Sequence, residues 1–465
     1  MMLTLGQAHA LLPNSSVHGA AETGFTRVHT DTRSVQVGDL FAALRGERFD
    51  AHSFLQQAQA AGAAAALVDH VPAGCTLPCL VVPDTLAALQ QLAAAWRQRY
   101  SGPLIAVVGS NGKTTVTQMI ASVLHHWLAD GEPGPDSPAL ATAGNYNNHF
   151  GVPLTLLRLR QHHRAAVLEL GMNHAGEIAL LAALAQPTIA LVNNAQREHQ
   201  EFMASVEAVA LENGSVITAL GADGMAVLPA ADVYLPMWMK LAGPRRVLSF
   251  GLTAAADITA HTVWHSKAQH WALTVHTPIG SFNTTLALVG EHNVLNALAA
   301  TACAIAAGAP LTAIAAGLAA FQAMTGRSQT LRLARGAQTM TLIDDSYNAN
   351  PDSVRAAIDV LASLPGPRWL LLGDMGEVGT QGPQFHAEVG LHARSSGIDT
   401  VWAVGPLAAH AGAHRQFSSV AQLIAALSEG PQAASLLVKG SRFMQMERVV
   451  QALQADQATG AAHAA

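Results

Sequence analysis

The chain has 465 residues, of which half are hydrophobic and 12% are charged, and its formal net charge is −6. This length predicts two or three domains, each with its own core. The charge forms no basic run or stripe, so we expect no binding to nucleic acid. Three cysteines are too few for a disulfide framework, and the first seven residues lack the basic region of a secretory signal. These features favour a cytoplasmic protein with reduced thiols.

The first 101 residues predict a small α/β domain. Short apolar runs alternate with helical patterns, and Ser101-Gly102-Pro103 marks a boundary after them. The expected strands cover 37–44 and 63–68, and the expected helices cover 52–61 and 86–99.

Residues 102–325 predict a second, larger domain with a mainly parallel sheet, because apolar strands alternate with helices along it. The clearest strands are expected at 104–108, 167–171 and 189–194. Polar residues stand at strand ends here, and in open α/β sheets ligands bind outside the carboxyl ends of the strands. We expect 130–137 and 223–244 to be surface excursions.

The stretch 294–326 contains no charged residue and is therefore a candidate membrane span. It is mostly Ala, and Gly308-Ala309-Pro310 interrupts it in the middle. Two packed helices joined by a turn are the better prediction, because proline ends a helix and the pieces are too short to cross a bilayer.

Residues 326–465 predict a third domain, in which the alternating pattern starts again. Strands are expected at 340–345, 369–374, 400–405 and 435–440, with a helix over 353–364. The predicted fold class is thus α/β, with three domains in a row.

The stretch 104–115 predicts a phosphate-binding loop between a strand and a helix. The loop itself reads Gly109, Ser110, Asn111, Gly112, Lys113, Thr114 and Thr115. Glycines allow backbone N–H groups to converge on a phosphate, and the start of a helix favours an anion. Lys113 would reach the terminal phosphates, and the Thr114 hydroxyl would bind Mg²⁺. The longer form of the motif is not met, because Val107 stands at its first glycine, so an ordinary strand-to-helix turn remains the alternative.

Two other features of the second domain carry candidate chemistry. Glu169 interrupts an apolar strand, where an isolated acid is costly unless it is paired or bound to a metal, or lies in water at the strand end. As a Mg²⁺ ligand it would complement Thr114. The segment 144–153 is rich in side-chain amides, among them Asn145, Asn147 and Asn148, which suit a polar, anionic or sugar-bearing ligand or simply a turn.

Further candidates follow strand ends or open helices. His199 follows a strand end and would face the phosphate site, although a lone histidine is more often a filler. Asn293 and Asn296 lie one turn apart on a helix, which suits a base-binding surface or a helix cap. Arg327 stands at the entry to the third domain, from where an arginine could neutralise transferring phosphate charge.

Together these stretches resemble the Mur ligase family. The motifs that carry the resemblance are DTRSVQVGDLFAALRGE (31–47), GSNGKTT (109–115), GNYNNHFGVP (144–153), LELGMNHAGEI (168–178), GEHNVLNALAA (290–300), DDSYNANPDS (344–353), LGDMGEVG (372–379) and KGSRFMQME (439–447). They follow the family order and span almost the whole chain. DDSYNANPDS and LGDMGE resemble the branch that joins D-alanyl-D-alanine to UDP-N-acetylmuramoyl-tripeptide.

The resemblance implies an ATP-dependent amide ligase of cytoplasmic peptidoglycan precursor synthesis in a bacterium, with ATP and Mg²⁺ as cofactors. Its expected domains are a UDP-substrate domain (1–101), a central ATPase (102–325) and a Rossmann-like ligase domain (326–465). ATP would phosphorylate the acceptor carboxylate, and the amine of D-alanyl-D-alanine would attack the acyl phosphate. A monomer without a membrane-spanning segment is expected. The alternatives are a related ligase that adds a single amino acid to a muramoyl or folyl acceptor, and a nucleotide-gated binding protein.

The resemblance also implies roles for individual residues. Those for ATP are Gly109, Ser110, Asn111, Gly112, Lys113, Thr114, Thr115, His292, Asn293, Asn296, Arg327 and Asp345. Those for Mg²⁺ are Thr114, Thr115, Glu169 and His199. The catalytic set is Lys113, Glu169, His199 and Arg327. Those for the substrates are Thr32, Arg33 and Ser34 at the uridine end, Asn145, Asn147 and Asn148 at the diphosphate and sugar, and Asn348, Asn350 and Lys439.

One position departs from the family pattern. The family has a carbamoylated lysine after the His199 position, which helps to bind a second Mg²⁺, whereas this chain has Asn213. No lysine occurs between Lys113 and Lys240, so a shift of the alignment cannot restore it. Glu212 or a water molecule would take its place, or the second metal is held differently. We therefore expect activity that does not depend on bicarbonate.

Overall fold

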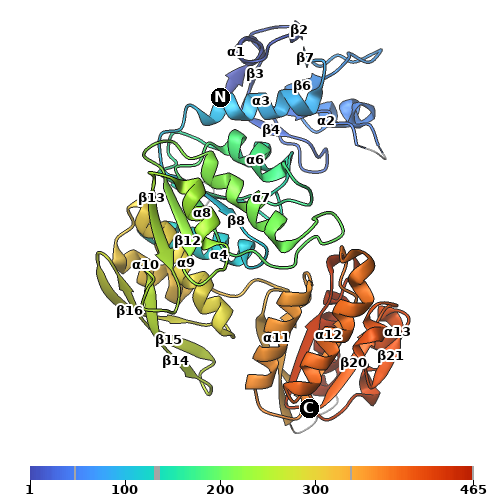
Figure 1. Ribbon diagram of the computed structural model, residues 1–465. Coiled ribbons are helices and arrows are strands. Elements are labelled where there is room, and N and C mark those ends of the chain that lie inside the picture. The colour runs from blue at the N-terminus through green and yellow to red at the C-terminus, as the bar shows by residue number, and fades with distance from the viewer. Residues whose placement is uncertain (47–48, 130–136, 336–337, 463–465) are drawn as a thin grey trace.

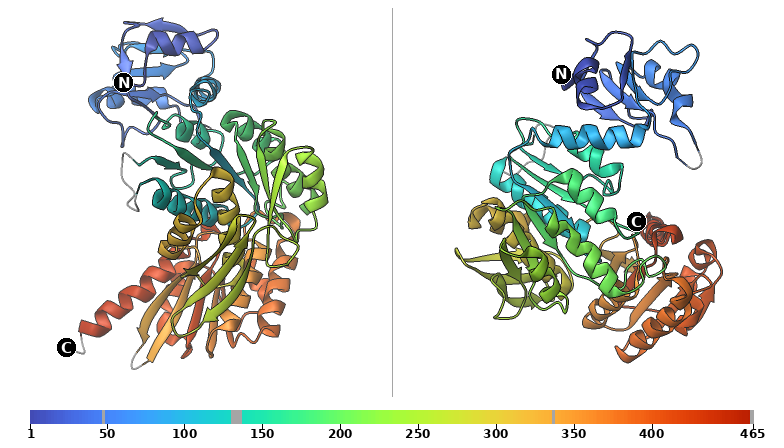
Figure 2. Two further views of the ribbon diagram at one scale, coloured as in Figure 1. Left: turned by 90° about the vertical axis from the view of Figure 1, so that its left-hand side faces the viewer. Right: turned by 45° about the horizontal axis from the view of Figure 1, so that its top comes forward.

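The computed structural model describes residues 1–46, 49–129, 137–335 and 338–462, and Figure 1 shows three α/β units that follow one another along the chain. The N-terminal unit lies at one end, the central unit lies in the middle, and the C-terminal unit packs against the side of the central unit that faces away from the N-terminus. Figure 2 shows the last helix, α14 (Glu447–Ala462), extending from the C-terminal unit.

The N-terminal unit is built on a five-stranded sheet with the order β2-β7-β6-β5-β4. Its strands are β2 (Ser16–His18), β4 (Arg27–His29), β5 (Asp39–Ala42), β6 (Ala65–Val68) and β7 (Cys79–Val81), beside a small ladder of β1 (Leu3–Thr4) and β3 (Gly24–Phe25). Its helices are α1 (Leu5–Leu11), α2 (Leu55–Ala60) and α3 (Thr85–Arg97). Helix α3 packs against the central unit as well as against its own unit, because its buried Leu89 and Leu92 lie in the same apolar cluster as Leu156 of the central unit.

The central unit has a six-stranded, all-parallel sheet with the order β13-β12-β11-β8-β10-β9. Its strands are β8 (Leu104–Val108), β9 (Ala139–Ala141), β10 (Ala165–Glu169), β11 (Ile189–Val192), β12 (Met225–Pro229) and β13 (Arg246–Phe250). Its helices are α4 (Lys113–Leu128), α5 (Gly151–Leu156), α6 (Glu177–Ala185), α7 (Val206–Thr218), α8 (Leu235–Ala242), α9 (Glu291–Ala307) and α10 (Leu311–Ala320).

The middle strand β8 shows why this sheet is covered on both faces. Ile105 and Val107 pack into the cluster that contains α4 and α9, while Ala106 and Val108 pack into the opposite cluster with α6 and α7. Successive side chains of a strand point to opposite faces, so a strand buried on both sides is apolar at every position. The order also crosses over at β8, since its neighbours β10 and β11 follow each other in the chain. Ligands of open α/β sheets bind at such a crossover.

The structure contradicts one of the two surface excursions expected in the central unit. The stretch 223–244 is not a surface excursion: it forms β12 inside the sheet and α8, whose Trp238 is fully buried. The prediction was wrong because Gly224, Pro229 and Pro236 are typical of turns, although the short apolar run between the first two forms a strand. Most of 130–137 lies outside the described residues.

The uncharged stretch 294–326 forms α9, the turn at Gly308, and α10, as expected. No helix among the described residues is long and apolar enough to cross a membrane. An antiparallel sheet of β14 (Thr259–His265), β15 (His270–Thr277) and β16 (Gly280–Leu286), not expected from the sequence, packs against α10. The three cysteines are free thiols.

The C-terminal unit has a six-stranded sheet with the order β17-β18-β22-β19-β20-β21, parallel except for the β17–β18 pair. Its strands are β17 (Gln329–Arg335), β18 (Gln338–Asp345), β19 (Arg368–Gly373), β20 (Thr400–Val404), β21 (Arg415–Phe417) and β22 (Ser435–Lys439). Its helices, besides α14, are α11 (Pro351–Ser363), α12 (Gly382–Ser395) and α13 (Val420–Ala425). The carboxyl end of β18 and the start of α11 face the central sheet.

Candidate functional site

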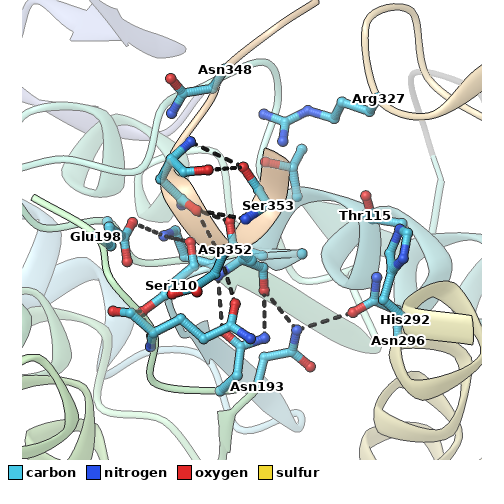
Figure 3. Close-up of a pocket in the computed structure, with 18 of the residues that line it drawn as sticks. Ser110, Thr115, Asn193, Glu198, His292, Asn296, Arg327, Asn348, Asp352 and Ser353 are labelled. Atoms are coloured by element: carbon cyan, nitrogen blue, oxygen red, sulfur yellow. Dashed lines mark hydrogen bonds and ion pairs between the residues drawn. The ribbon is translucent and has the colours of Figure 1, made fainter. Parts of the chain in front are cut away.

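A cavity of about 1280 Å³ lies between the carboxyl edge of the central sheet and the C-terminal unit. Figure 3 shows Ser110, Asn193 and Asn296 on one side of it and Arg327 and Asn348 on the other. The two units therefore contribute opposite walls of one site.

The predicted phosphate loop lines the cavity on the side of the central unit. Strand β8 ends at Val108, and Gly109 and Gly112 turn the chain with positive φ angles of 137° and 81°. A Cβ on Gly112 would lie 2.5 Å from Oδ1 of Asn296, so a side chain there would collide with the neighbouring helix. Glycine is required at this point because only glycine combines this backbone conformation with this close approach.

Two asparagines that follow β11 hold the loop in place. The backbone N–H of Asn111 donates to Oδ1 of Asn194 (2.9 Å), and Nδ2 of Asn193 donates to the carbonyl of Asn111 (2.8 Å) and to Oδ1 of Asn296 (3.0 Å). Asn193 and Asn194 were not among the predicted site residues, although their position at a strand end in this sheet was the available signal.

Lys113 lies folded over its own loop. Its Nζ donates to the carbonyl of Gly109 (2.5 Å) and to the carbonyl of Ser110 (3.3 Å), and it forms an ion pair with Oε1 of Glu198 (2.7 Å). Glu198 was not predicted as a site residue. An acid beside a candidate histidine in a loop gives no sequence signal of its own, and its partner lies 85 residues away.

Glu198 is buried, with 10% of its side chain exposed. Its Oε1 also lies 3.2 Å from Nε2 of His199, whereas its Oε2 is buried without a hydrogen-bond partner among the described residues. Burial alone would raise the pKa of Glu198, but Lys113 and His199 outweigh burial and hold that pKa below its ordinary value. The side chain is therefore a buried carboxylate with one unused oxygen.

Glu169 repeats this pattern at the end of β10. It is 2% exposed, and its Oε1 accepts a hydrogen bond from Nδ2 of Asn147 (2.8 Å). Its Oε2 is buried and finds no partner within the part of the chain that the structure describes. Thr114, also buried, lines the same cavity. An unused carboxylate oxygen and a hydroxyl at a phosphate loop are ligands that Mg²⁺ prefers, so these residues fit that ion.

His199 adopts a left-handed backbone conformation (φ 50°) and lies between two acids. Its Nε2 faces Glu198, and its Nδ1 lies 2.6 Å from Oε2 of Glu377, which comes from the C-terminal unit. Burial lowers the pKa of His199, but the two carboxylates outweigh burial and raise it to about 9. The structure thus brings His199 into the cavity, as expected, and links it to both walls.

The start of α9 forms a polar end of the cavity. Nδ2 of Asn296 donates to Oδ1 of Asn293 (3.1 Å), and Nδ2 of Asn293 donates to the carbonyl of Val289 (2.8 Å). His292 lies beside them, and residues at and after the ends of β12 and β13, among them Phe250, continue the lining. This end combines amides with apolar surface, which suits a nucleobase.

The C-terminal wall carries Arg327 and Asp345. The guanidinium of Arg327 lies over the ring of Tyr347, 4.1 Å from its centroid. Asp345 is fully engaged: Oδ2 pairs with Nζ of Lys439 (2.5 Å), and Oδ1 accepts from the backbone of Ser328 (3.0 Å). Lys439 is 3% exposed and also donates to the carbonyl of Asn348 (2.9 Å). The ammonium group of Lys439 is thus paired within the C-terminal unit.

Direct contacts join the two walls. Nδ2 of Asn350 donates to Oδ1 of Asn111 in the phosphate loop (2.8 Å), while its own Oδ1 caps α11. Arg197 forms ion pairs with Asp352 (2.6 Å) and Glu388 (2.8 Å) of the C-terminal unit. These contacts hold the C-terminal unit over the loop.

Some predicted residues lie elsewhere. Thr32, Arg33 and Ser34 are in the N-terminal unit and do not line the cavity. Arg33 is exposed and pairs with Asp31 (2.6 Å). By contrast, the amide-rich segment does reach the cavity, where Asn145, Asn147 and Asn148 form part of its lining.

The position of the missing lysine offers no carboxylate to the cavity. Glu212 uses both oxygens on the start of α6, accepting from the backbone N–H of Gly176 (2.8 Å) and of Ile178 (2.7 Å). Asn213 is 1% exposed, and its Nδ2 has no partner among the described residues. Neither side chain lines the cavity.

Outside this cavity, one group of described residues lies within metal-binding distance. The ligand atoms of His52, Asp69 and His70 lie within 4.8 Å of one another in the N-terminal unit. Arg45 already pairs with Asp69 (3.0 Å), and His52 pairs with Asp50 (2.6 Å). This group therefore already contacts other charged side chains of the N-terminal unit.

Comparison with known proteins finds members of one family along almost the whole chain. Family models match three segments: "Mur ligase family, catalytic domain" over 25–97, "Mur ligase middle domain" over 107–304 and "Mur ligase, glutamate ligase domain" over 326–442. The UDP-N-acetylmuramoyl-tripeptide–D-alanyl-D-alanine ligase of Escherichia coli strain K12 is 42% identical and covers 97% of this chain and 98% of its own. The ligase of the same name from Bacillus subtilis strain 168 is 35% identical, covering 94% and 93%. A crystal structure of MurF from Acinetobacter baumannii superposes with a TM-score of 0.87 at 35% identity, covering 97% and 98%.

Proposed function

The chain belongs to the Mur ligase family, and from this premise we propose that the cavity between the central and C-terminal units is its ligation site. The protein is an ATP-dependent peptide ligase that adds D-alanyl-D-alanine to UDP-N-acetylmuramoyl-tripeptide in peptidoglycan synthesis. The observation that carries the assignment to this cavity is the contact of the phosphate loop with the C-terminal unit through Asn111 and Asn350.

The chemistry explains why two walls are needed. A carboxylate is a poor electrophile, so ATP first transfers its γ-phosphoryl group to the terminal carboxylate of the tripeptide. The free amine of D-alanyl-D-alanine then attacks the carbonyl carbon of the acyl phosphate. The tetrahedral intermediate loses a proton from its nitrogen to solvent and collapses, the bond from carbon to the phosphate oxygen breaks, and phosphate leaves. The protein positions the reactants and offsets negative charge.

The central wall binds ATP in this proposal. Residues 109–115 surround the triphosphate, and Lys113 moves from the loop carbonyls and Glu198 to the terminal phosphates. His292, Asn293 and Asn296 bind the nucleoside end. Thr114, Thr115 and Glu169 would hold Mg²⁺, which neutralises phosphate charge when it is bound. His199 would join them by giving up one of its contacts with Glu198 and Glu377. Arg327, stacked on Tyr347, reaches the γ-phosphate from the opposite wall.

The substrates lie between the three units. The proposal places the uridine end of the acceptor on Thr32, Arg33 and Ser34, and its diphosphate and sugar along Asn145, Asn147 and Asn148. Asn348 and Asn350 then border the reacting peptide end. Lys439 is a positioning residue, because its ammonium is used on Asp345 and Asn348. Asp345 in turn faces the nucleotide from the C-terminal unit.

We also infer a monomer that acts in the cytoplasm. Both walls of the cavity come from one chain, so a second copy is not needed to complete the site. ATP and the UDP-linked acceptor are cytoplasmic reactants.

A phosphate-release assay with UDP-N-acetylmuramoyl-tripeptide, MgATP and a panel of amines tests the function. Phosphate release is expected with D-alanyl-D-alanine and not with D-alanine, L-alanine or glutamate, and mass spectrometry should find the pentapeptide product. Release with a single amino acid, or with a folyl acceptor, would overturn the substrate assignment. The absence of release with every amine would favour the non-catalytic binding protein.

A further inference from the structure

Glu198 is a buried acid for which the cavity supplies too few partners. Its Oε1 is shared by Lys113 (2.7 Å) and His199 (3.2 Å), while its Oε2 is buried and unpartnered among the described residues. A buried carboxylate is stable only when it is paired or coordinates a metal. In this structure the loop lysine provides most of that pairing.

Binding of a triphosphate removes this partner. The ammonium of a phosphate-loop lysine serves the terminal phosphates, so Lys113 has to leave Glu198 when the nucleotide enters. The carboxylate then faces incoming phosphate charge with Oε2 unpartnered and with His199 as the remaining contact of Oε1. Like charges in a buried site repel strongly, so another cation has to replace the lysine there.

Other nearby acids are not free to take this role. Both oxygens of Glu212 accept hydrogen bonds from the backbone at the start of α6, and Asn213 beside it is neutral. Glu377 is paired with His199 and is about half exposed. Among the described residues that line the cavity, Glu198 and Glu169 are thus the two acids that each combine deep burial with an unused oxygen.

We propose that Glu198 is a metal-binding residue, whose carboxylate exchanges Lys113 for a divalent cation when the nucleotide occupies the loop. The second carboxylate of the metal site then comes from the loop after β11, and helix α7 at Asn213 does not supply it. This inference rests on the proposed function only in that a nucleotide binds at residues 109–115.

Metal binding can be measured without turnover. The full chain is titrated with Mn²⁺ in the presence of β,γ-imido-ATP, and free Mn²⁺ is followed by electron paramagnetic resonance. We expect Glu198→Gln to bind about one Mn²⁺ per chain fewer than the wild type, or to bind it at least tenfold more weakly. Glu201→Gln is the matched control, because Glu201 lies three residues further along the same loop with an exposed side chain. It should match the wild type.

Glu198→Asp separates a ligand from a structural residue. A shortened carboxylate should recover part of the lost Mn²⁺ binding, and a thermal unfolding scan should show both variants folded. The proposal is overturned if Glu198→Gln binds Mn²⁺ like the wild type. It is also overturned if Glu198→Asp and Glu198→Gln lose binding equally.

The function and this inference fail in different ways. Mn²⁺ binding needs neither the tripeptide nor D-alanyl-D-alanine. A wild type that binds Mn²⁺ through Glu198 but ligates no amine would refute the proposed function alone. A wild type that ligates D-alanyl-D-alanine while Glu198→Gln keeps its full Mn²⁺ binding would refute the inference alone.

Discussion

Each of the two large sheets carries a buried lysine–carboxylate pair at its carboxyl edge, and the two pairs differ in how completely the carboxylate is satisfied. In the C-terminal unit, Lys439 meets Asp345, whose second oxygen accepts from Ser328. In the central unit, Lys113 meets Glu198, whose second oxygen has no partner among the described residues. Both pairs place a cation beside the same cavity.

The difference indicates separate roles. A pair with all its hydrogen bonds made is costly to open and fixes the shape of the wall that it supports. A pair with an unused oxygen is easier to open, because a ligand can supply the carboxylate with a partner for the oxygen that the pair leaves free. We therefore regard the Lys439–Asp345 pair as a fixed support and the Lys113–Glu198 pair as a resting arrangement that opens for ATP.

Lys113→Ala should produce the largest loss of activity. Removal of a preorganised donor to the transferring phosphate charge costs about 10²–10³-fold in rate, so phosphate release with D-alanyl-D-alanine should fall by at least about 10²-fold. The loss should persist in Lys113→Ala/Glu198→Gln, because neutralising Glu198 does not restore a cation for the phosphates. Ligation within tenfold of the wild type would contradict the assignment of the loop.

Lys439→Met should mainly reduce stability. It leaves Asp345 without its cation, and breaking a buried pair costs about 3–5 kcal/mol in the free energy of unfolding. Asp345→Asn/Lys439→Met should regain part of that cost in a urea titration. If the single variant unfolds like the wild type, the Lys439–Asp345 pair is not a structural support.

The Arg197 contacts between the units should weaken in acid. Hydrogen bonds from Arg197 hold the pKa of Glu388 below its ordinary value. A carboxyl with a lowered pKa contributes stability above its unfolded pKa, about 4.3, and loses it as pH falls through the lowered value. The stability difference between wild type and Glu388→Gln should be about 1 kcal/mol near neutral pH, since the pair is partly exposed.

Urea titrations from pH 6.5 down to pH 3.5 check this prediction. The difference between wild type and Glu388→Gln should shrink as the pH falls below about 4.3. A stability difference that stays constant over this pH range would mean that the pKa of Glu388 is the same in the folded and the unfolded chain.

Removal of bicarbonate should have the smallest effect. Asn213 cannot form a carbamate, so phosphate release should be the same, within error, in buffer depleted of CO₂ and after bicarbonate is added back. Activity that disappears on depletion and returns with bicarbonate would show that a carbamate is used, and would remove the need for Glu198 as its replacement.

Local patterns predicted much of this architecture. The strand at 104–108, the glycine turn after it and the paired helices in 294–326 follow from apolar runs and from glycine and proline positions. Glu169 was recognised because a charged residue interrupts an apolar strand. Each of these signals lies within a few neighbouring residues.

Long-range partners were not predictable in the same way. Glu198 resembles any loop acid until the fold brings it to Lys113, 85 residues away. Asn350 and Asn111 are 239 residues apart, so their contact across the cavity depends on how two units pack. Strand β12 was missed because its short apolar run lies between Gly224 and Pro229, residues that are typical of turns.

Transfer of oxygen from the acceptor to phosphate tests the central claim most directly. UDP-N-acetylmuramoyl-tripeptide is labelled with ¹⁸O in its terminal carboxylate and ligated to D-alanyl-D-alanine with unlabelled MgATP. Because the carboxylate oxygen stays with phosphorus when the acyl phosphate is cleaved, each released phosphate should carry one ¹⁸O atom. Amide product accompanied by phosphate without ¹⁸O would contradict phosphorylation of the carboxylate at this site.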